Sequence, residues 1–186
     1  PVIVGGRFGM YESVRVPLIE LLNLTGAGGL NDRAIYCWPS DHPQNLSGDA
    51  DALREADVIV CLDVIDINNT MGTYAIRRRS DILEARDKAA PKIIDISLNG
   101  IDNNSWTAFG GPTPPIDLQI VCEPQHGVDQ LISAVRKTLE RDDTSHGRIE
   151  ARKKVLSDRH DALRAKQTAK ARENWDAAPI KIERMI

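Results

Sequence analysis

The sequence lacks the features that mark membrane-spanning, secreted and zinc-binding proteins. No apolar run approaches the ~20 residues that a membrane-spanning helix needs, and no signal peptide is present. Cysteine occurs only three times, and Cys61 and Cys122 lie in apolar stretches, so we expect reduced thiols and a cytoplasmic setting. Cys37 lies near His42 but belongs to no CxxC pair, which argues against a structural zinc site.

A large excess of either charge is also missing, as is a recognisable catalytic set. The 24 basic and 27 acidic side chains give a net charge of −3, which disfavours a nucleic-acid-binding surface. No carboxylate pair, Ser-His-Asp set or Cys-His set stands out in the sequence. We therefore expect no catalytic residue and no metal ligand in this chain, and we predict that the isolated chain is inactive.

The length and the charge distribution predict one domain with an appended segment. A chain of 186 residues buries roughly 70% of its unfolded surface, which is enough for a core of its own. Residues 142–174 are charged and favour helix, with a thin apolar stripe formed by Ile149, Leu156 and Leu163. We predict an α/β domain over residues 1–141 and a charged helical linker over residues 142–186.

Short apolar stretches alternate with helix-like stretches in the first 141 residues. Strands are predicted at residues 1–5, 57–64, 92–98 and 118–122. Helices are predicted at residues 16–25, 48–56, 71–90 and 128–139. Loops are predicted at residues 31–48 and 99–115. This alternation predicts a Rossmann-like α/β fold, with a parallel sheet and helices on both of its faces.

The first strand runs directly into glycines, in the sequence PVIVGGRFG over residues 1–9. Glycines between a strand and a helix let backbone N–H groups approach a phosphate in nucleotide-binding folds. Gly5, Gly6 and Gly9 do not form GxGxxG, and no acidic residue closes a recognisable ribose-binding strand about 20 residues further on. A phosphate-binding turn and a tight turn without a ligand both fit the pattern. Because the chain starts inside a strand without an initiator Met, we expect a piece of a longer protein.

Five stretches occur in an order that is typical of one enzyme family. They are PVIVGGR (1–7), WPSDHP (38–43), ALREADVIV (52–60), KIIDI (92–96) and the tail from Trp175 to Met185. Together they resemble the central domain of thiamine diphosphate (ThDP)-dependent enzymes of the acetolactate synthase, oxalyl-CoA decarboxylase and benzoylformate decarboxylase group.

The resemblance implies a DHS-like NAD/FAD-binding variant of the Rossmann-like fold, which lies between a pyrimidine-binding and a diphosphate-binding domain of the same protein. Those flanking domains would hold ThDP and Mg²⁺ in a cytoplasmic homodimer or homotetramer. The parent enzyme would be a lyase or synthase that acts on 2-oxo acids or acyl-CoA-type substrates. The central domain would be a scaffold that supports the oligomer and borders the active site without catalysing the reaction itself.

Some relatives are also implied to hold FAD, ADP or CoA at the carboxyl ends of the strands. The candidate cofactor-binding residues are Gly5, Gly6, Arg7, His42 and Asp95. The family places G-x-R-x after the second strand, where this chain has Asp63 and Asp66, and two carboxylates should repel a diphosphate. This departure disfavours FAD and ADP, and His42 could instead be a loop histidine bonded to the backbone. Two alternatives stay open, a stand-alone FAD-, ADP- or CoA-binding module and a ligand-free structural or oligomerisation domain.

Overall fold

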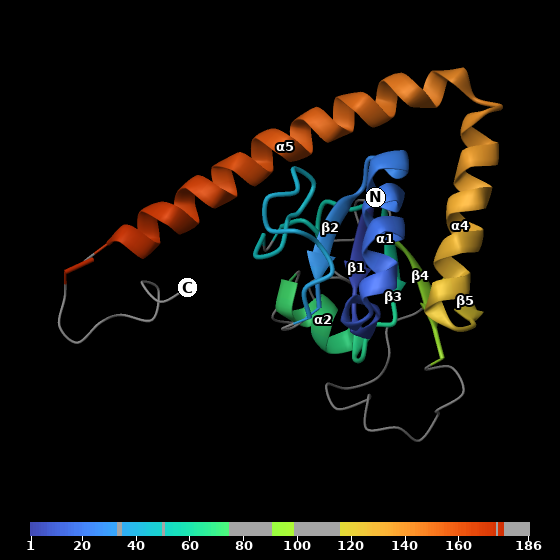
Figure 1. Cartoon of the computed structure of the whole chain (residues 1–186), viewed down its shortest axis with the longest axis horizontal. Coiled ribbons are helices and arrows are strands. Elements are labelled where there is room, and N and C mark those ends of the chain that lie inside the picture. The colour runs from blue at the N-terminus through green and yellow to red at the C-terminus, as the bar shows by residue number, and fades with distance from the viewer. Residues whose placement is uncertain (33–34, 50, 75–90, 99–115, 174, 177–186) are drawn as a thin grey trace.

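The computed structural model describes residues 1–32, 35–49, 51–74, 91–98, 116–173 and 175–176, and within them five strands form one parallel sheet (Figure 1). The strands are β1 (Val2–Gly5), β2 (Gly28–Asn31), β3 (Val58–Leu62), β4 (Lys92–Ser97) and β5 (Leu118–Val121). Their order across the sheet is β2-β1-β3-β4-β5, and every neighbouring pair is parallel. The expected Rossmann-like α/β fold is therefore confirmed.

Helices connect these strands. They are α1 (Arg15–Thr25), α2 (Ile67–Tyr74), α4 (Pro124–Leu139) and α5 (Asp143–Arg172), with the short 3-10 turns η1 (Arg7–Met10) and η2 (Glu12–Val14) before α1. Pro17 lies in the first turn of α1, where its missing N–H leaves no hydrogen bond unmade. The same helix ends at Gly26, whose positive φ of 59° is typical of a helix C-cap.

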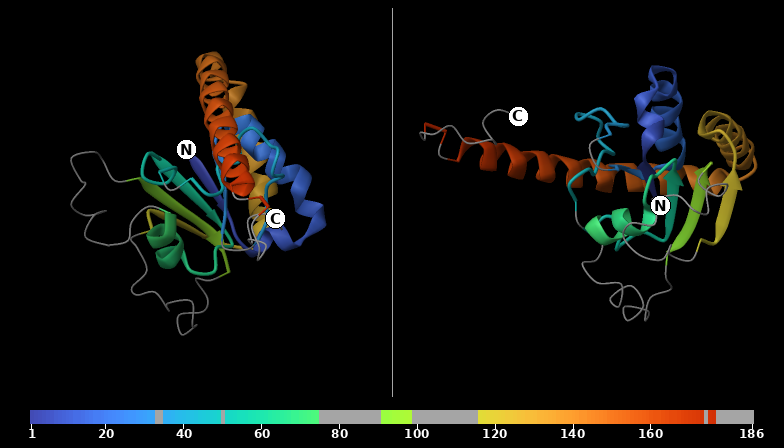
Figure 2. Two further views of the ribbon diagram at one scale, coloured as in Figure 1. Left: turned by 90° about the vertical axis from the view of Figure 1, so that its left-hand side faces the viewer. Right: turned by 90° about the horizontal axis from the view of Figure 1, so that it is seen from below.

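The helices cover both faces of the sheet, with α1 and α4 on one face and α2 on the other (Figure 2). On the first face Leu22 of α1 and Val128 of α4 are fully buried in one apolar cluster with strand residues. On the second face Ile67 and Met71 of α2 join a cluster that contains Ile59 of β3. Burial of apolar side chains on both faces explains why β3 is apolar almost throughout.

Strand β2 lies within residues that we predicted to end a helix and begin a loop. Its glycines have low strand propensity, and the strand forms because its backbone finds partners on both sides. On one side it pairs with β1. On the other side Gly29 donates its N–H to Gln44 O at 2.8 Å and accepts from the N–H of Leu46 at 2.8 Å. The following segment thus protects the sheet edge.

The helix predicted over residues 48–56 is wrong, because the described part of this segment forms turns. Asp49 accepts a hydrogen bond from the N–H of Asp51 at 2.9 Å, and this local turn competes with helix formation. The helix predicted from Met71 begins earlier, at Ile67. Residues 75–90, the loop 99–115 and the tail 177–186 lie outside the described residues.

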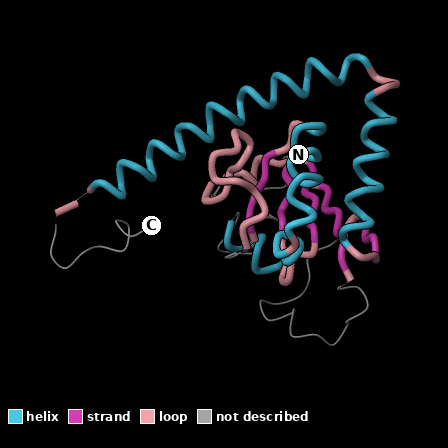
Figure 3. The backbone as a smooth tube through the Cα atoms, viewed as in Figure 1, coloured by secondary structure: helices cyan, strands magenta, loops and turns pink. Residues whose placement is uncertain are grey.

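Helix α5 is the charged helix that the sequence predicts. It begins after Asp142, whose side chain accepts from the N–H of Thr144, and its later turns extend beyond the strands (Figure 3). Ile149 is buried against Gly26, and Leu156 and Leu163 pack against the core, so the predicted apolar stripe faces the domain. Among the described residues, no helix is both long and apolar enough to cross a lipid bilayer.

Candidate functional site

The order of the strands places a topological switch point between β1 and β3. The chain leaves β1 toward β2 on one side of the sheet, whereas β3 lies on the other side of β1. In open parallel sheets the crevice at the carboxyl ends of two such strands is where ligands bind. Gly5, Gly6 and Arg7 end β1 at this point, and Asp63 directly follows β3.

The crevice at the switch point is closed by the residues that form it. The N–H of Gly6 donates to Leu62 O at 2.9 Å, and the N–H of Arg7 donates to Asp63 O at 3.0 Å. The Arg7 guanidinium also binds the Asp63 carboxylate at 2.6 Å. A Cβ on Gly6 would lie 2.2 Å from Asp63 O, so the glycine serves a close approach of two backbones. These N–H groups are therefore used within the protein and do not face a phosphate.

Gly5 is needed for a second close approach, on the α1 side of the crevice. A Cβ at this position would lie 2.4 Å from the sulfur of Cys37. Cys37 is buried, its Sγ donates to Gly6 O at 3.4 Å, and burial raises the pKa of its thiol to about 12. The thiol thus stays protonated and fills the space beside the glycines.

Asp66 occupies the amino end of α2. Its side chain accepts from the N–H of Asn69 at 2.9 Å, and its carbonyl accepts from the N–H of Thr70 at 2.9 Å. The carboxylate, which is only 4% exposed, therefore caps this helix and uses the N–H groups that would attract an anion. Asp63 and Asp66 both lie just past the end of β3, as the sequence predicts.

Asp32 corrects one inference from the sequence. It directly follows β2, which is the position of the acidic residue that binds ribose in dinucleotide-binding folds. We expected no such residue because β2 itself was not predicted. Asp32 is buried, and its Oδ1 accepts from the hydroxyl of Thr70 at 2.6 Å, so this carboxylate binds α2. Its Oδ2 has no hydrogen-bond partner in the described part of the chain.

Asp95 lies in the middle of β4, paired in register with Cys61. Its side chain is only 2% exposed, and its Oδ2 accepts from the hydroxyl of Ser97 at 2.8 Å. Within the described residues, its Oδ1 has no hydrogen-bond partner. Burial raises the pKa of Asp95, and the negative charge of Asp63 adds to the effect. Asp95 is thus a buried carboxyl group beside Asp63 and the crevice.

Substitution of Asp95 tests whether ionisation of this buried carboxyl group destabilises the folded protein. The folded state favours the protonated acid, so ionisation opposes folding as the pH rises above the unfolded pKa of 3.8 and then through the raised folded pKa. We expect Asp95→Asn to be more stable than the wild type by about 1 kcal/mol at pH 7, with the gain absent at pH 3. Urea unfolding at both values measures it. Asp161→Asn, on exposed α5, is the charge control; a less stable Asp95→Asn at pH 7 would contradict the prediction.

His42 takes no part in the crevice. It lies in the loop outside β2, where its Nδ1 accepts from the N–H of Gln44 at 3.2 Å. Burial lowers the pKa of His42, and the neighbouring His160 of α5 lowers it further. The structure therefore brings Gly5, Gly6 and Arg7 together with Asp95 close by, and it places His42 elsewhere, bonded to the backbone.

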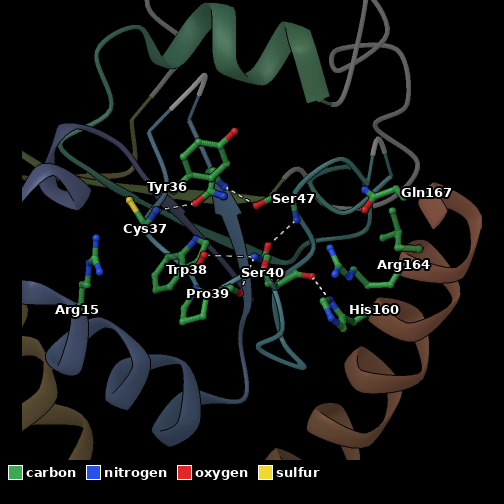
Figure 4. A pocket seen from close by; sticks show the side chains of 13 residues that line it. Arg15, Tyr36, Cys37, Trp38, Pro39, Ser40, Ser47, His160, Arg164 and Gln167 are labelled. Carbon is green, nitrogen blue, oxygen red and sulfur yellow. Dashed lines mark hydrogen bonds between the residues drawn. The ribbon is translucent and has the colours of Figure 1, made fainter. Parts of the chain in front are cut away.

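A pocket of about 710 Å³ lies on the outer side of β2, between the loop after this strand and α5 (Figure 4). It is lined by Arg15, Asn31, Tyr36, Cys37, Trp38, Pro39, Ser40, Asn45, Ser47, His160, Leu163, Arg164 and Gln167. The sequence alone gives no sign of this pocket, because its walls come from segments more than a hundred residues apart. No local pattern signals that α5 docks here.

Fold and crevice together define a Rossmann-like α/β domain whose switch point is filled by its own residues. Among the described residues, no group of three or more histidine, cysteine, aspartate or glutamate side chains could hold a metal ion. No protein-family model and no curated protein matches the sequence.

Proposed function

We propose that this chain is the central domain of a ThDP-dependent lyase or synthase, and that it acts as a scaffold. The proposal rests on one observation, a nucleotide-binding type of sheet whose switch-point crevice is filled by the Arg7–Asp63 pair and by backbone hydrogen bonds. Such a domain keeps the rigid frame of the fold without an open phosphate site. It is suited to hold neighbouring domains in place and to border their active site.

The stretches that resemble the family lie at structurally important places, which supports the proposal. Residues 1–7 form β1 and its exit, and residues 92–96 lie in β4, an interior strand between β3 and β5. Residues 38–43 belong to the loop outside β2, where Asn45 donates to Pro39 O at 2.9 Å.

ThDP and Mg²⁺ do not fit the described residues of this domain. Asp63 and Asp66 are engaged by Arg7 and by the N–H of Asn69, and the N–H groups of Gly6 and Arg7 are bonded to Leu62 O and Asp63 O. The proposal therefore assigns both to the flanking domains, and with them the chemistry on 2-oxo acids or acyl-CoA-type substrates. The cysteines of this chain are free thiols, in keeping with a cytoplasmic homodimer or homotetramer.

A ligand screen separates a scaffold from a nucleotide-binding module. We expect no thermal stabilisation of the 186-residue chain by FAD, ADP, CoA or NAD, and none by ThDP with Mg²⁺. A ligand at about 100 times its Kd should stabilise the chain by about 2.7 kcal/mol, so real binding is easily detected. Stabilisation by FAD, ADP or CoA that Arg7→Gln abolishes would favour the stand-alone nucleotide-binding module instead.

The link to ThDP is tested on the product of the complete reading frame. We expect it to extend beyond this chain on both sides and to purify as an oligomer with ThDP bound in a one-to-one ratio to the chain. Fluorescence after oxidation to thiochrome measures the ThDP content. A reading frame without flanking domains, or a full-length product that neither contains nor takes up ThDP, would refute the proposal.

A further inference from the structure

We propose that the pocket outside β2 binds an elongated small molecule that carries an anionic group at each end. This site is separate from the switch-point crevice, and the inference does not depend on the proposed scaffold role. It starts from the charges of the pocket, whose thirteen lining residues include two arginines and one histidine but no aspartate or glutamate. The pocket therefore has a positive lining although the chain as a whole carries a net charge of −3.

Half of the ten arginines that the structure describes form ion pairs, but the two pocket arginines, Arg15 and Arg164, do not. Five others form ion pairs with carboxylates, namely Arg7, Arg54, Arg136, Arg148 and Arg159. Arg15 and Arg164 pair with no carboxylate among the described residues, although both are exposed and line the same pocket. Two uncompensated guanidinium groups give the pocket a positive potential, and their planar donors match phosphate and carboxylate oxygens.

The two arginines lie at opposite walls of the pocket. Arg15 is the first residue of α1, whereas Arg164 projects from α5 on the far side, with Trp38, Pro39 and Ser40 between them (Figure 4). A single small anion at one wall would leave the other guanidinium without a partner. A ligand with two separated anionic groups satisfies both, and a volume of about 710 Å³ is ample for it.

The space between the arginines suits a body that is apolar in part and hydroxylated in part. Tyr36 is 76% exposed, and its aromatic ring is a surface for stacking. Trp38 is buried, and its Nε1 has no acceptor within the described residues. Ser40 and the amide of Gln167 add polar groups at the same pocket. Sugar bisphosphates and aliphatic dicarboxylates share the required chemistry.

Both walls are held in place without a ligand. Asn31 accepts from the N–H of Cys37 at 2.8 Å and donates its own N–H to the Ser47 hydroxyl at 3.0 Å. His160 of α5 bonds through Nδ1 to Asn45 O at 2.7 Å, which ties the helix to the loop. Because loop and helix are fixed to one another, binding costs little ordering entropy.

The test uses the 186-residue chain with two two-ended probes, fructose 1,6-bisphosphate and adipate, and one single-ended probe, fructose 6-phosphate. We expect at least one two-ended probe to raise the Tm saturably, by roughly 5 °C at a hundredfold excess over its Kd. The single-ended probe should bind at least about tenfold more weakly. A stronger response to the bisphosphate or to adipate identifies which anionic group the pocket takes.

Substitutions assign the binding to the pocket. Arg15→Gln and Arg164→Gln should each raise the Kd of the two-ended probe about tenfold, as measured by calorimetry. Arg141→Gln removes the same charge from an exposed residue outside the pocket and should leave the Kd unchanged. All three variants should keep their Tm without probe, because these side chains are exposed. The inference is overturned if neither two-ended probe binds, if fructose 6-phosphate binds equally well, or if Arg141→Gln weakens binding as much as the pocket variants.

Discussion

Replacement of Gly6 by alanine should lower the free energy of unfolding by about 3 kcal/mol. The added Cβ would lie 2.2 Å from the carbonyl oxygen and 2.6 Å from the carbonyl carbon of Asp63. Both are backbone atoms, and no side-chain rotation can relieve the clash. The ends of β1 and β3 must separate, which also breaks the hydrogen bond from the N–H of Arg7 to Asp63 O. Urea unfolding followed by circular dichroism measures the change.

Gly147→Ala is the matched control for this substitution. Gly147 lies within α5, and an added Cβ would meet no atom within 4 Å. Alanine is the better helix former, so this variant should gain up to about 1 kcal/mol. If Gly6→Ala were as stable as the wild type, the backbones of Gly6 and Asp63 would not be in close contact. The crevice would then not be closed as described, and the proposed scaffold role would lose its support.

Arg159→Gln should have the second largest effect, a loss of about 2 kcal/mol. Arg159 binds both Asp49 and Glu55, and through them it joins α5 to the turns after β2. The side chain of Asp49 is only 11% exposed, so it would keep a desolvated charge without its partner. Urea unfolding gives the stability. Faster proteolytic cleavage within residues 164–172 would report that α5 has detached.

The pH dependence identifies the ion pair as the cause of that loss. Burial opposes ionisation of Asp49, yet hydrogen bonds from Arg159 and from the N–H of Asp51 lower its pKa. The stabilisation is therefore complete above the unfolded pKa of 3.8 and disappears as the pH falls through the lower folded pKa. The difference between Arg159→Gln and the wild type should shrink accordingly below pH 3.8.

Arg148→Gln is the control on the same helix. Arg148 also pairs with an aspartate, Asp142, but its side chain is 67% exposed, so the loss should stay within about 0.5 kcal/mol. Equal effects of the two substitutions would mean that Arg159 acts as an ordinary surface charge. Helix α5 would then not be anchored as described, and the wall that it gives to the pocket would be open to question.

The two large predictions both concern contacts between distant segments, one at the switch point and one between α5 and the loop after β2. At the switch point Gly6, Arg7 and Asp63 fill the place of a phosphate. On the outer side of β2, Arg159 and His160 hold α5 against the loop and leave a positively charged pocket instead.

Much of the fold was accessible from the sequence. Strand β3 and helix α4 follow from a continuous apolar run and from an apolar stripe at helical spacing, and both formed as predicted. Pro17 and Gly26 fixed the ends of α1. Asp63 was expected just past the end of β3, where it lies beside Gly6 and pairs with Arg7. Each of these signals lies within a few neighbouring residues.

The errors have a common physical cause. Strand β2 contains two glycines and forms only because β1 and the segment at Gln44 supply its backbone partners. Asp32 could not be recognised as the residue that ends a strand while that strand was unknown. Residues 48–56 resemble a helix in composition, but Asp49 binds the N–H of Asp51 and the distant Arg159.

Apolar spacing, prolines, glycines and charge runs therefore set the class of fold, the central strands and the long charged helix of this protein, because they act on conformation within one or two turns of chain. The filled crevice and the lateral pocket were set by contacts between distant segments, such as Gly6 with Asp63 and His160 with Asn45. Such contacts depend on how strands and helices are placed in space. Only the tertiary structure therefore decided whether a glycine faces a ligand or another backbone.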